Sequence, residues 1–136
     1  MKLVVFGVLG SLFCFLLANE ATAAEFSCQT PASGAYCQYI GPVRLVYNNA
    51  DGLILMYYEA PVDIAQASSV GLPCGFGSAG AAAAMHDTIW DVEGFFNKSL
   101  LAALMLTKAL KSDIWVQLRC ANGTTPYLQI DRFWLK

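Results

Sequence analysis

The first 23 residues have the three parts of a secretory signal peptide. Met1 and Lys2 form a short basic start, residues 3–18 form an uncharged run rich in Leu, Val and Phe, and residues 21–23 (Ala-Thr-Ala) match the small residues that a signal peptidase reads. The apolar run is shorter than the ~20 residues that cross a bilayer. We therefore expect cleavage after Ala23, a secreted or periplasmic location, and a mature chain, residues 24–136, without a transmembrane anchor.

Export places the remaining cysteines in an oxidising compartment, where an even number indicates disulfides. There are four of them, Cys28, Cys37, Cys74 and Cys120. Four cysteines allow three pairings. The turn-prone segment 31–34 favours a local Cys28–Cys37 bridge, which leaves Cys74 to pair with Cys120. The chain has no Cys-x-x-Cys pair and one histidine, so we expect no metal site.

The mature chain of about 110 residues fits a single domain. Its formal net charge is −2, and like charges form no block along the sequence. Nucleic-acid binding needs clustered Lys and Arg to neutralise phosphates. We therefore expect no nucleic-acid partner.

Apolar and alternating segments predict a mainly β domain. The pattern predicts a hairpin with strands at residues 42–47 and 53–58 and a turn at 48–52. The second of these strands is apolar on both faces, which is typical of a strand that is covered on each side or lies at a subunit contact. Residues 113–120 and 127–135 read as two further strands. In the last strand, the alternation groups Leu128, Ile130, Arg132 and Trp134 on one face.

The segment 60–89 is rich in Pro, Gly, Ser and Ala and predicts a long loop. We expect a short strand near residues 70–76, and either one helical turn or irregular structure at 81–85.

Residues 97–110 predict the one helix, with Asn97 as its N-cap. Its wide apolar face is expected to contain Leu101, Met105, Leu106 and neighbouring alanines. Leu100 and Leu104 then fall on the arc of Lys108 and Lys111. Such a helix is either deeply buried with a few surface leucines or has a second contact surface. We take Leu100 and Leu104 as candidate contacts of a homo-oligomer; in the alternative, the 60–89 loop covers them.

The predicted fold is a single domain of mainly β structure with one α-helix, arranged as a small OB-like barrel or half-barrel. An open antiparallel sheet with one packed helix is the alternative.

Catalytic patterns are weak in this sequence. His86 is the only histidine and stands beside Asp87, but no nucleophile-elbow motif accompanies it. The spelling Gly75-x-Gly77-x-x-Gly80 lacks the βαβ unit that a dinucleotide site requires. We expect no catalytic residue and no cofactor, and hence not an enzyme.

Aromatic residues are the remaining functional signal. Trp115 shares its strand face with Gln117 and Arg119 and is the best candidate for an exposed ligand-binding aromatic. The leading hypothesis is a secreted, non-enzymatic binding module for a glycan or cell-surface ligand. The alternative is a secreted inhibitor that binds another protein through residues 74–86. Asn97 and Asn122 begin glycosylation sequons, which matter only in a eukaryotic host.

Residues 99–135 resemble the C-terminal third of the B subunits of cholera and heat-labile enterotoxins. The shared pattern is a Leu- and Ala-rich helix, a strand ending in Cys120, an Asn-containing turn closing in Thr125-Pro126, and a strand with Ile130. The helix–strand–Cys–turn–strand order is also similar to that of small secreted bacterial proteins. The toxin resemblance implies an OB fold, a pentameric ring with the helix lining its pore, and binding of cell-surface glycans. Ala121 and Asn122 follow Cys120 where those subunits carry a receptor-site tryptophan, so no binding residue is carried over.

Overall fold

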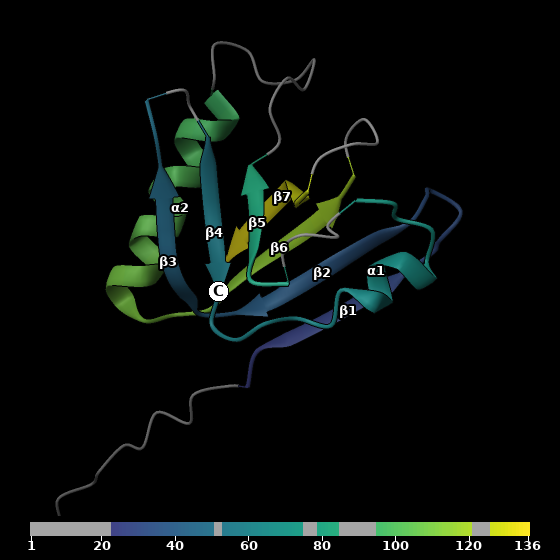
Figure 1. Ribbon diagram of the computed structural model, residues 1–136. Coiled ribbons are helices and arrows are strands. Elements are labelled where there is room, and N and C mark those ends of the chain that lie inside the picture. The colour runs from purple at the N-terminus through teal and green to yellow at the C-terminus, as the bar shows by residue number, and fades with distance from the viewer. Residues whose placement is uncertain (1–22, 51–52, 75–78, 85–94, 121–125) are drawn as a thin grey trace, which may run out of the picture.

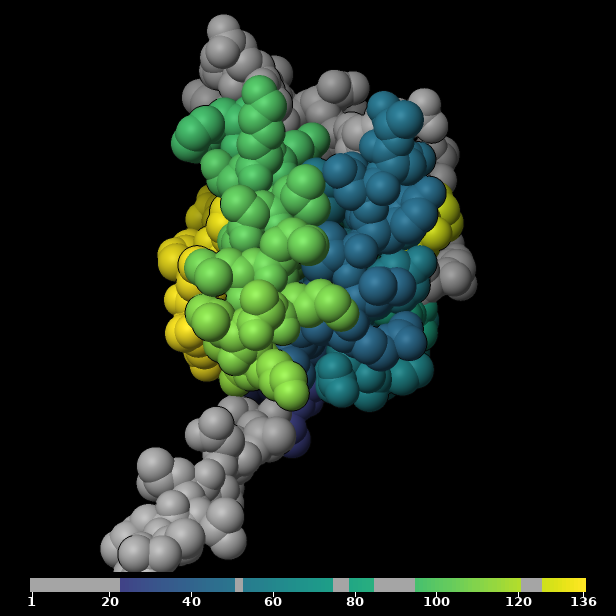
Figure 2. Space-filling model, turned by 90° about the vertical axis from the view of Figure 1, so that its left-hand side faces the viewer, coloured from purple at the N-terminus to yellow at the C-terminus, as the bar shows by residue number. Residues whose placement is uncertain are grey.

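The computed structural model describes residues 23–50, 53–74, 79–84, 95–120 and 126–136. Seven strands form one sheet in the order β1-β2-β6-β7-β5-β4-β3. The main helix, α2, packs against β3, β4 and β7, and a short helix, α1, lies beside β1 (Figure 1). Figure 2 shows α2 side by side with β3 on one face of the molecule. The elements are β1 (Glu25–Gln29), β2 (Tyr36–Gly41), β3 (Val43–Asn48), β4 (Ile54–Tyr58), α1 (Ala65–Ser69), β5 (Ala81–Ala84), α2 (Phe95–Leu110), β6 (Ile114–Arg119) and β7 (Leu128–Leu135).

The domain is therefore mainly β with one main helix, as predicted, and it has the open-sheet form of the two predicted architectures. The edge strands β1 and β3 each pair with one neighbour, so the described sheet does not close into a barrel. The prediction that all strands are antiparallel is wrong in one place, because β5 runs parallel to β7.

A one-residue connection forces this open sheet to curl. Pro42 alone separates β2 from β3, although the two strands lie five positions apart in the strand order. In a flat sheet they would stand about 24 Å apart, at ~4.8 Å per strand. Two peptide units reach only ~7 Å. The two ends of the sheet must therefore approach each other at Pro42.

The side chain of Tyr39 fills the corner that this curl creates. Its hydroxyl donates a hydrogen bond to the Pro42 carbonyl at 2.7 Å and accepts one from the Glu59 backbone N–H at 3.2 Å. Its ring lies 4.8 Å from that of Tyr58, four strand positions away. Gly41 makes room for it, because a Cβ there would stand 2.8 Å from the Tyr39 hydroxyl.

The predicted hairpin is present as β3 and β4, and the last two predicted strands are present as β6 and β7. β4 is buried along both faces, as its composition predicted. The expected helical turn or loop at residues 81–85 is wrong for Ala81–Ala84, which form β5 in the middle of the sheet. The described part of the expected strand near 70–76 is not a strand. Sequence analysis also missed β1, β2 and α1.

The predicted orientation of the helix is wrong. Leu100 and Leu104 are fully buried in the core, whereas Met105, Leu106 and Leu110 are exposed. The buried stripe of α2 is Leu100, Ala103, Leu104 and Thr107, which follows the i, i+3, i+4, i+7 spacing of one helix face. Of these, Leu100 and Leu104 belong to one hydrophobic core with the inner sheet residues Met56, Ile114 and Ile130, among others. The homo-oligomer prediction therefore loses the two contact residues on which it was based.

Both predicted disulfides are present, Cys28–Cys37 and Cys74–Cys120. The first joins directly paired residues of β1 and β2. The second ties the segment before β5 to the residue after β6, across 46 positions of sequence. Two disulfides fit a chain that folds in an oxidising compartment. No helix in the described segments has the length and apolar character needed to cross a bilayer.

Two leucine-to-alanine substitutions in α2 test its orientation. Leu104→Ala should lower the free energy of unfolding by about 2–5 kcal/mol, because it opens a cavity in the core. Leu106→Ala removes the same atoms from a side chain that is 47% exposed and should change stability by less than about 1 kcal/mol. Denaturant unfolding measures both. Equal losses, or a larger loss for Leu106→Ala, would mean that the helix is rotated from the orientation described.

Candidate functional site

The three predicted binding residues lie on one face of β6, as the alternation predicted. Ile114, Val116 and Leu118 are buried on the opposite face. Trp115 and Arg119 are partly exposed, whereas Gln117 is buried, at 6% exposure. The candidate site is therefore centred on β6, between its neighbours β2 and β7.

A bulge in β7 brings further residues to this face that sequence analysis missed. Gln117 pairs with Arg132 and Leu118 pairs with Ile130, so Asp131 is an extra residue in the ladder. The bulge reverses the predicted alternation after Ile130. Trp134 consequently stands directly across from Trp115. The sequence did contain one signal of this bulge: a polar residue, Asp131, follows the core-facing Ile130 and precedes the aromatic end of the strand.

The two tryptophans form the aromatic part of the site. Their ring centroids are 4.2 Å apart and their planes meet at 73°. Trp134 is 51% exposed. An edge-to-face pair of this kind holds each indole in place, and the exposed indole is available for a ligand.

Arg119 and Asp131 form an ion pair, with Arg119 four residues along β6 from Trp115. Nε of Arg119 lies 3.1 Å from Oδ2 of Asp131. With its amide oxygen turned towards Arg119, Gln117 accepts hydrogen bonds from Nε and Nη2 at 3.0 and 3.2 Å. Burial raises the pKa of the Asp131 carboxyl, and the guanidinium of Arg119 opposes that rise. The other carboxylate oxygen, Oδ1, is buried and has no partner in the described segments.

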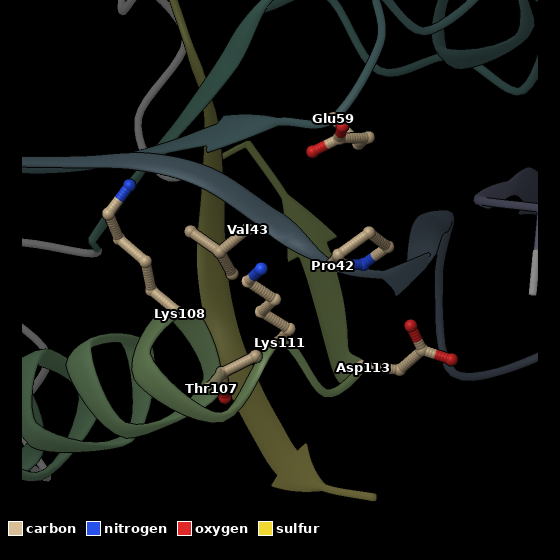
Figure 3. Close-up of a pocket in the computed structure, with 7 residues that line it drawn as sticks. All are labelled: Pro42, Val43, Glu59, Thr107, Lys108, Lys111 and Asp113. Atoms are coloured by element: carbon tan, nitrogen blue, oxygen red, sulfur yellow. The ribbon is translucent and has the colours of Figure 1, made fainter. Parts of the chain in front are cut away.

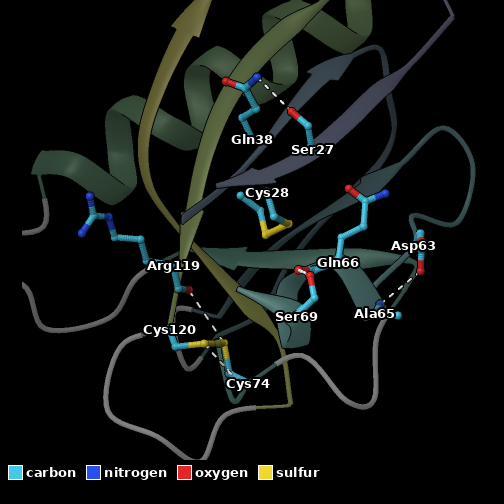
Figure 4. Close-up of a disulfide and its surroundings, with 11 residues drawn as sticks. Ser27, Cys28, Gln38, Asp63, Ala65, Gln66, Ser69, Cys74, Arg119 and Cys120 are labelled. Atoms are coloured by element: carbon cyan, nitrogen blue, oxygen red, sulfur yellow. Dashed lines mark hydrogen bonds between the residues drawn. A yellow bond between two sulfur atoms is a disulfide. The ribbon is translucent and has the colours of Figure 1, made fainter. Parts of the chain in front are cut away.

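Strand β2 extends the polar surface on the other side of β6. The guanidinium of Arg119 lies over the ring of Tyr36, 5.8 Å from its centroid, a distance at which a cation and an aromatic face attract. Gln38 pairs with Gln117 and donates a hydrogen bond to Ser27 on β1 at 3.0 Å (Figure 4). The Cys74–Cys120 disulfide holds the chain immediately after Arg119 (Figure 4).

We call this surface the aromatic–polar face. It consists of six residues from three adjacent strands: Tyr36, Trp115, Gln117, Arg119, Asp131 and Trp134. Arg119 and Asp131 neutralise each other, and the exposed Arg132, which pairs with Gln117, adds one cation beside them. The arrangement suits recognition of a neutral or weakly anionic, hydroxyl-rich ligand better than that of a highly charged one.

The other predicted site residues do not join this face. Leu100 and Leu104 lie in the core. Within the proposed inhibitory loop 74–86, residues 81–84 form a buried central strand and are not accessible. His86, Asp87 and Asn122 lie outside the described residues. The prediction that Asn97 is the N-cap of the helix is wrong: α2 begins at Phe95, and Asn97 lies in its first turn with its Oδ1 buried. The described segments contain no group of three His, Cys, Asp or Glu residues suited to a metal.

Comparison of the chain with protein-family models, curated proteins and solved structures finds no significant match. The resemblance to enterotoxin B subunits therefore stays a prediction, and the functional argument depends on the site alone.

A double-mutant cycle tests the pairing of Arg119 with Asp131. Alanine substitutions at both positions should show a coupling free energy of about 1 kcal/mol, because the two side chains are in contact and partly buried. The matched cycle pairs Arg44→Ala with Asp131→Ala and should show a coupling below about 0.3 kcal/mol, because Arg44 lies on β3, three strand positions from β7. Denaturant unfolding supplies the four free energies for each cycle. Equal coupling in the two cycles would contradict the geometry described.

Proposed function

We propose that this protein is a secreted, non-enzymatic binding module that recognises a glycan, as a free oligosaccharide or on a cell-surface ligand. The aromatic–polar face is the proposed site. The observation that carries the proposal is the half-exposed Trp134 beside Trp115, on the same face as the Gln117–Arg119–Asp131 cluster.

Sugar rings have two kinds of surface, and the proposed site offers a partner to each. The C–H groups on one face of a pyranose are apolar and carry partial positive charge, which complements the negative face of an indole. The ring's hydroxyls lie around its edge and need fixed donors and acceptors. Trp134 would supply the stacking surface, and the amide, guanidinium and carboxylate along β6 and β7 would supply the hydrogen bonds.

The rigidity of the site supports the same proposal. All six residues project from paired strands rather than from loops, and the Cys28–Cys37 and Cys74–Cys120 bridges hold the strands and their ends. Side chains that are already ordered lose little entropy when a ligand binds.

A glycan array with the purified mature protein is the first test, followed by titration of any bound glycan. Trp134→Ala should weaken the affinity by about thirtyfold or more, as for the loss of a central aromatic contact. Tyr47→Ala is the matched control, because Tyr47 is a similarly exposed aromatic residue on β3, and it should leave the affinity unchanged. The proposal fails if the wild-type protein binds no glycan, or if Trp134→Ala binds as tightly as the wild type.

A further inference from the structure

A cleft of about 380 Å³ opens where strand β2 bends into β3, at the C-terminal end of α2 (Figure 3). Pro42 and Val43 line one wall, and the last turn of α2 lines another. The volume is in the range of small-molecule sites, roughly 300–1,000 Å³. None of the six residues of the aromatic–polar face lines it.

Four charged side chains of both signs surround this cleft. Lys108 and Lys111 come from the end of α2, Glu59 follows β4, and Asp113 precedes β6 (Figure 3). None of the four forms an ion pair within the described segments, where Arg119–Asp131 is the pair found. Lys108 donates one hydrogen bond to the Arg44 carbonyl at 2.7 Å, which leaves two of its three ammonium donors for another partner.

The charges are divided between the two sides of the cleft. Both lysines belong to the helix end. Burial raises the pKa of the Tyr39 hydroxyl and the hydrogen bond from the Glu59 backbone opposes that rise, while the negative charges of Glu59 and Asp113 act to raise it. Both carboxylates therefore lie near this hydroxyl. A ligand in the cleft would therefore meet cations towards the helix and carboxylates towards the Tyr39 corner.

Two features of the helix end describe the wall of the cleft. Lys111 adopts a φ of 52°, a left-handed conformation in which glycine is the common residue at a helix end, and the following N–H, of Ser112, bonds back to the Thr107 carbonyl at 3.1 Å. Thr107 lines the cleft and is 1% exposed, and its hydroxyl has no partner in the described segments. Buried hydroxyls are normally paired.

We propose that this cleft binds a small zwitterion, of the class of a free amino acid or a short peptide. Its carboxylate would lie between Lys108 and Lys111, and its ammonium group would face Glu59 and Asp113. A simple anion would be attracted by the two lysines but repelled by the two carboxylates. A simple cation would be attracted by the carboxylates but repelled by the lysines. A ligand with both charges satisfies both sides.

Three probes that differ only in charge test the proposal on the mature protein. They are the dipeptide Ala-Ala, its N-acetylated form, which lacks the ammonium, and its C-terminal amide, which lacks the carboxylate. Titration followed by backbone amide NMR should give saturable shifts at residues 107–113. Ala-Ala should bind at least about tenfold more tightly than either blocked form, as each blocked form loses a charged hydrogen-bonding group. Absence of shifts with Ala-Ala, or equal affinity for a blocked form, overturns the proposal.

Variants of Lys111 and Glu59 separate binding from folding. Lys111→Gly removes the ammonium and places the favoured residue in the left-handed conformation, so the variant should fold at least as well as the wild type and yet bind Ala-Ala roughly tenfold more weakly. Glu59→Gln should weaken the binding of Ala-Ala, because it removes a negative charge that faces the ammonium group. It should not weaken the binding of the N-acetylated probe, which has no ammonium group. Lys98→Gln, at the other end of α2, is the control and should change nothing. Unchanged Ala-Ala affinity in Lys111→Gly would overturn the assignment.

Discussion

The single residue between β2 and β3 is the constraint on which the rest of this structure depends. Pro42 connects the second strand of the sheet to the last one, so the sheet cannot lie flat. Proline suits this place because it lacks the N–H that would continue the ladder. The curl brings the inner faces of β2 and β4 together through Tyr39 and Tyr58 and encloses a core that α2 covers with Leu100 and Leu104.

The same curl sets where ligands can approach. On the inside of the bend, the meeting of the sheet's two ends with the end of α2 leaves the cleft lined by Pro42 and Lys111. On the outside, β2, β6 and β7 expose one continuous surface, to which the bulge at Asp131 adds Trp134. One packed core thus supports two surfaces of different chemistry. One is aromatic and carries little net charge, and we propose a glycan as its ligand; the other carries charges of both signs, and we propose a zwitterion as its ligand.

Local patterns in the sequence predicted the β3–β4 hairpin, the last two strands, the end of the helix at Leu110, both disulfides and the shared face of Trp115, Gln117 and Arg119. The predictions that were wrong concern features that depend on tertiary contacts. Ala81–Ala84 is helix-compatible by propensity, but pairing with β4 and β7 makes it a strand. The orientation of the helix was predicted wrongly because α2 is apolar on several sides. It buries a polar residue, Thr107, and leaves Met105 exposed. Trp134 was missed because the bulge reverses the strand's alternation.

A matched pair of tyrosine-to-phenylalanine substitutions tests most directly whether the Tyr39 corner holds the curl. Tyr39→Phe removes the hydroxyl that bridges Pro42 and Glu59. It should lower the free energy of unfolding by about 1–3 kcal/mol and speed hydrogen exchange at the Glu59 amide. Tyr58→Phe removes a buried hydroxyl that has no partner in the described segments, so stability should be unchanged or higher. Equal losses in the two variants, or an unchanged exchange rate at Glu59 in Tyr39→Phe, would contradict this account of the fold.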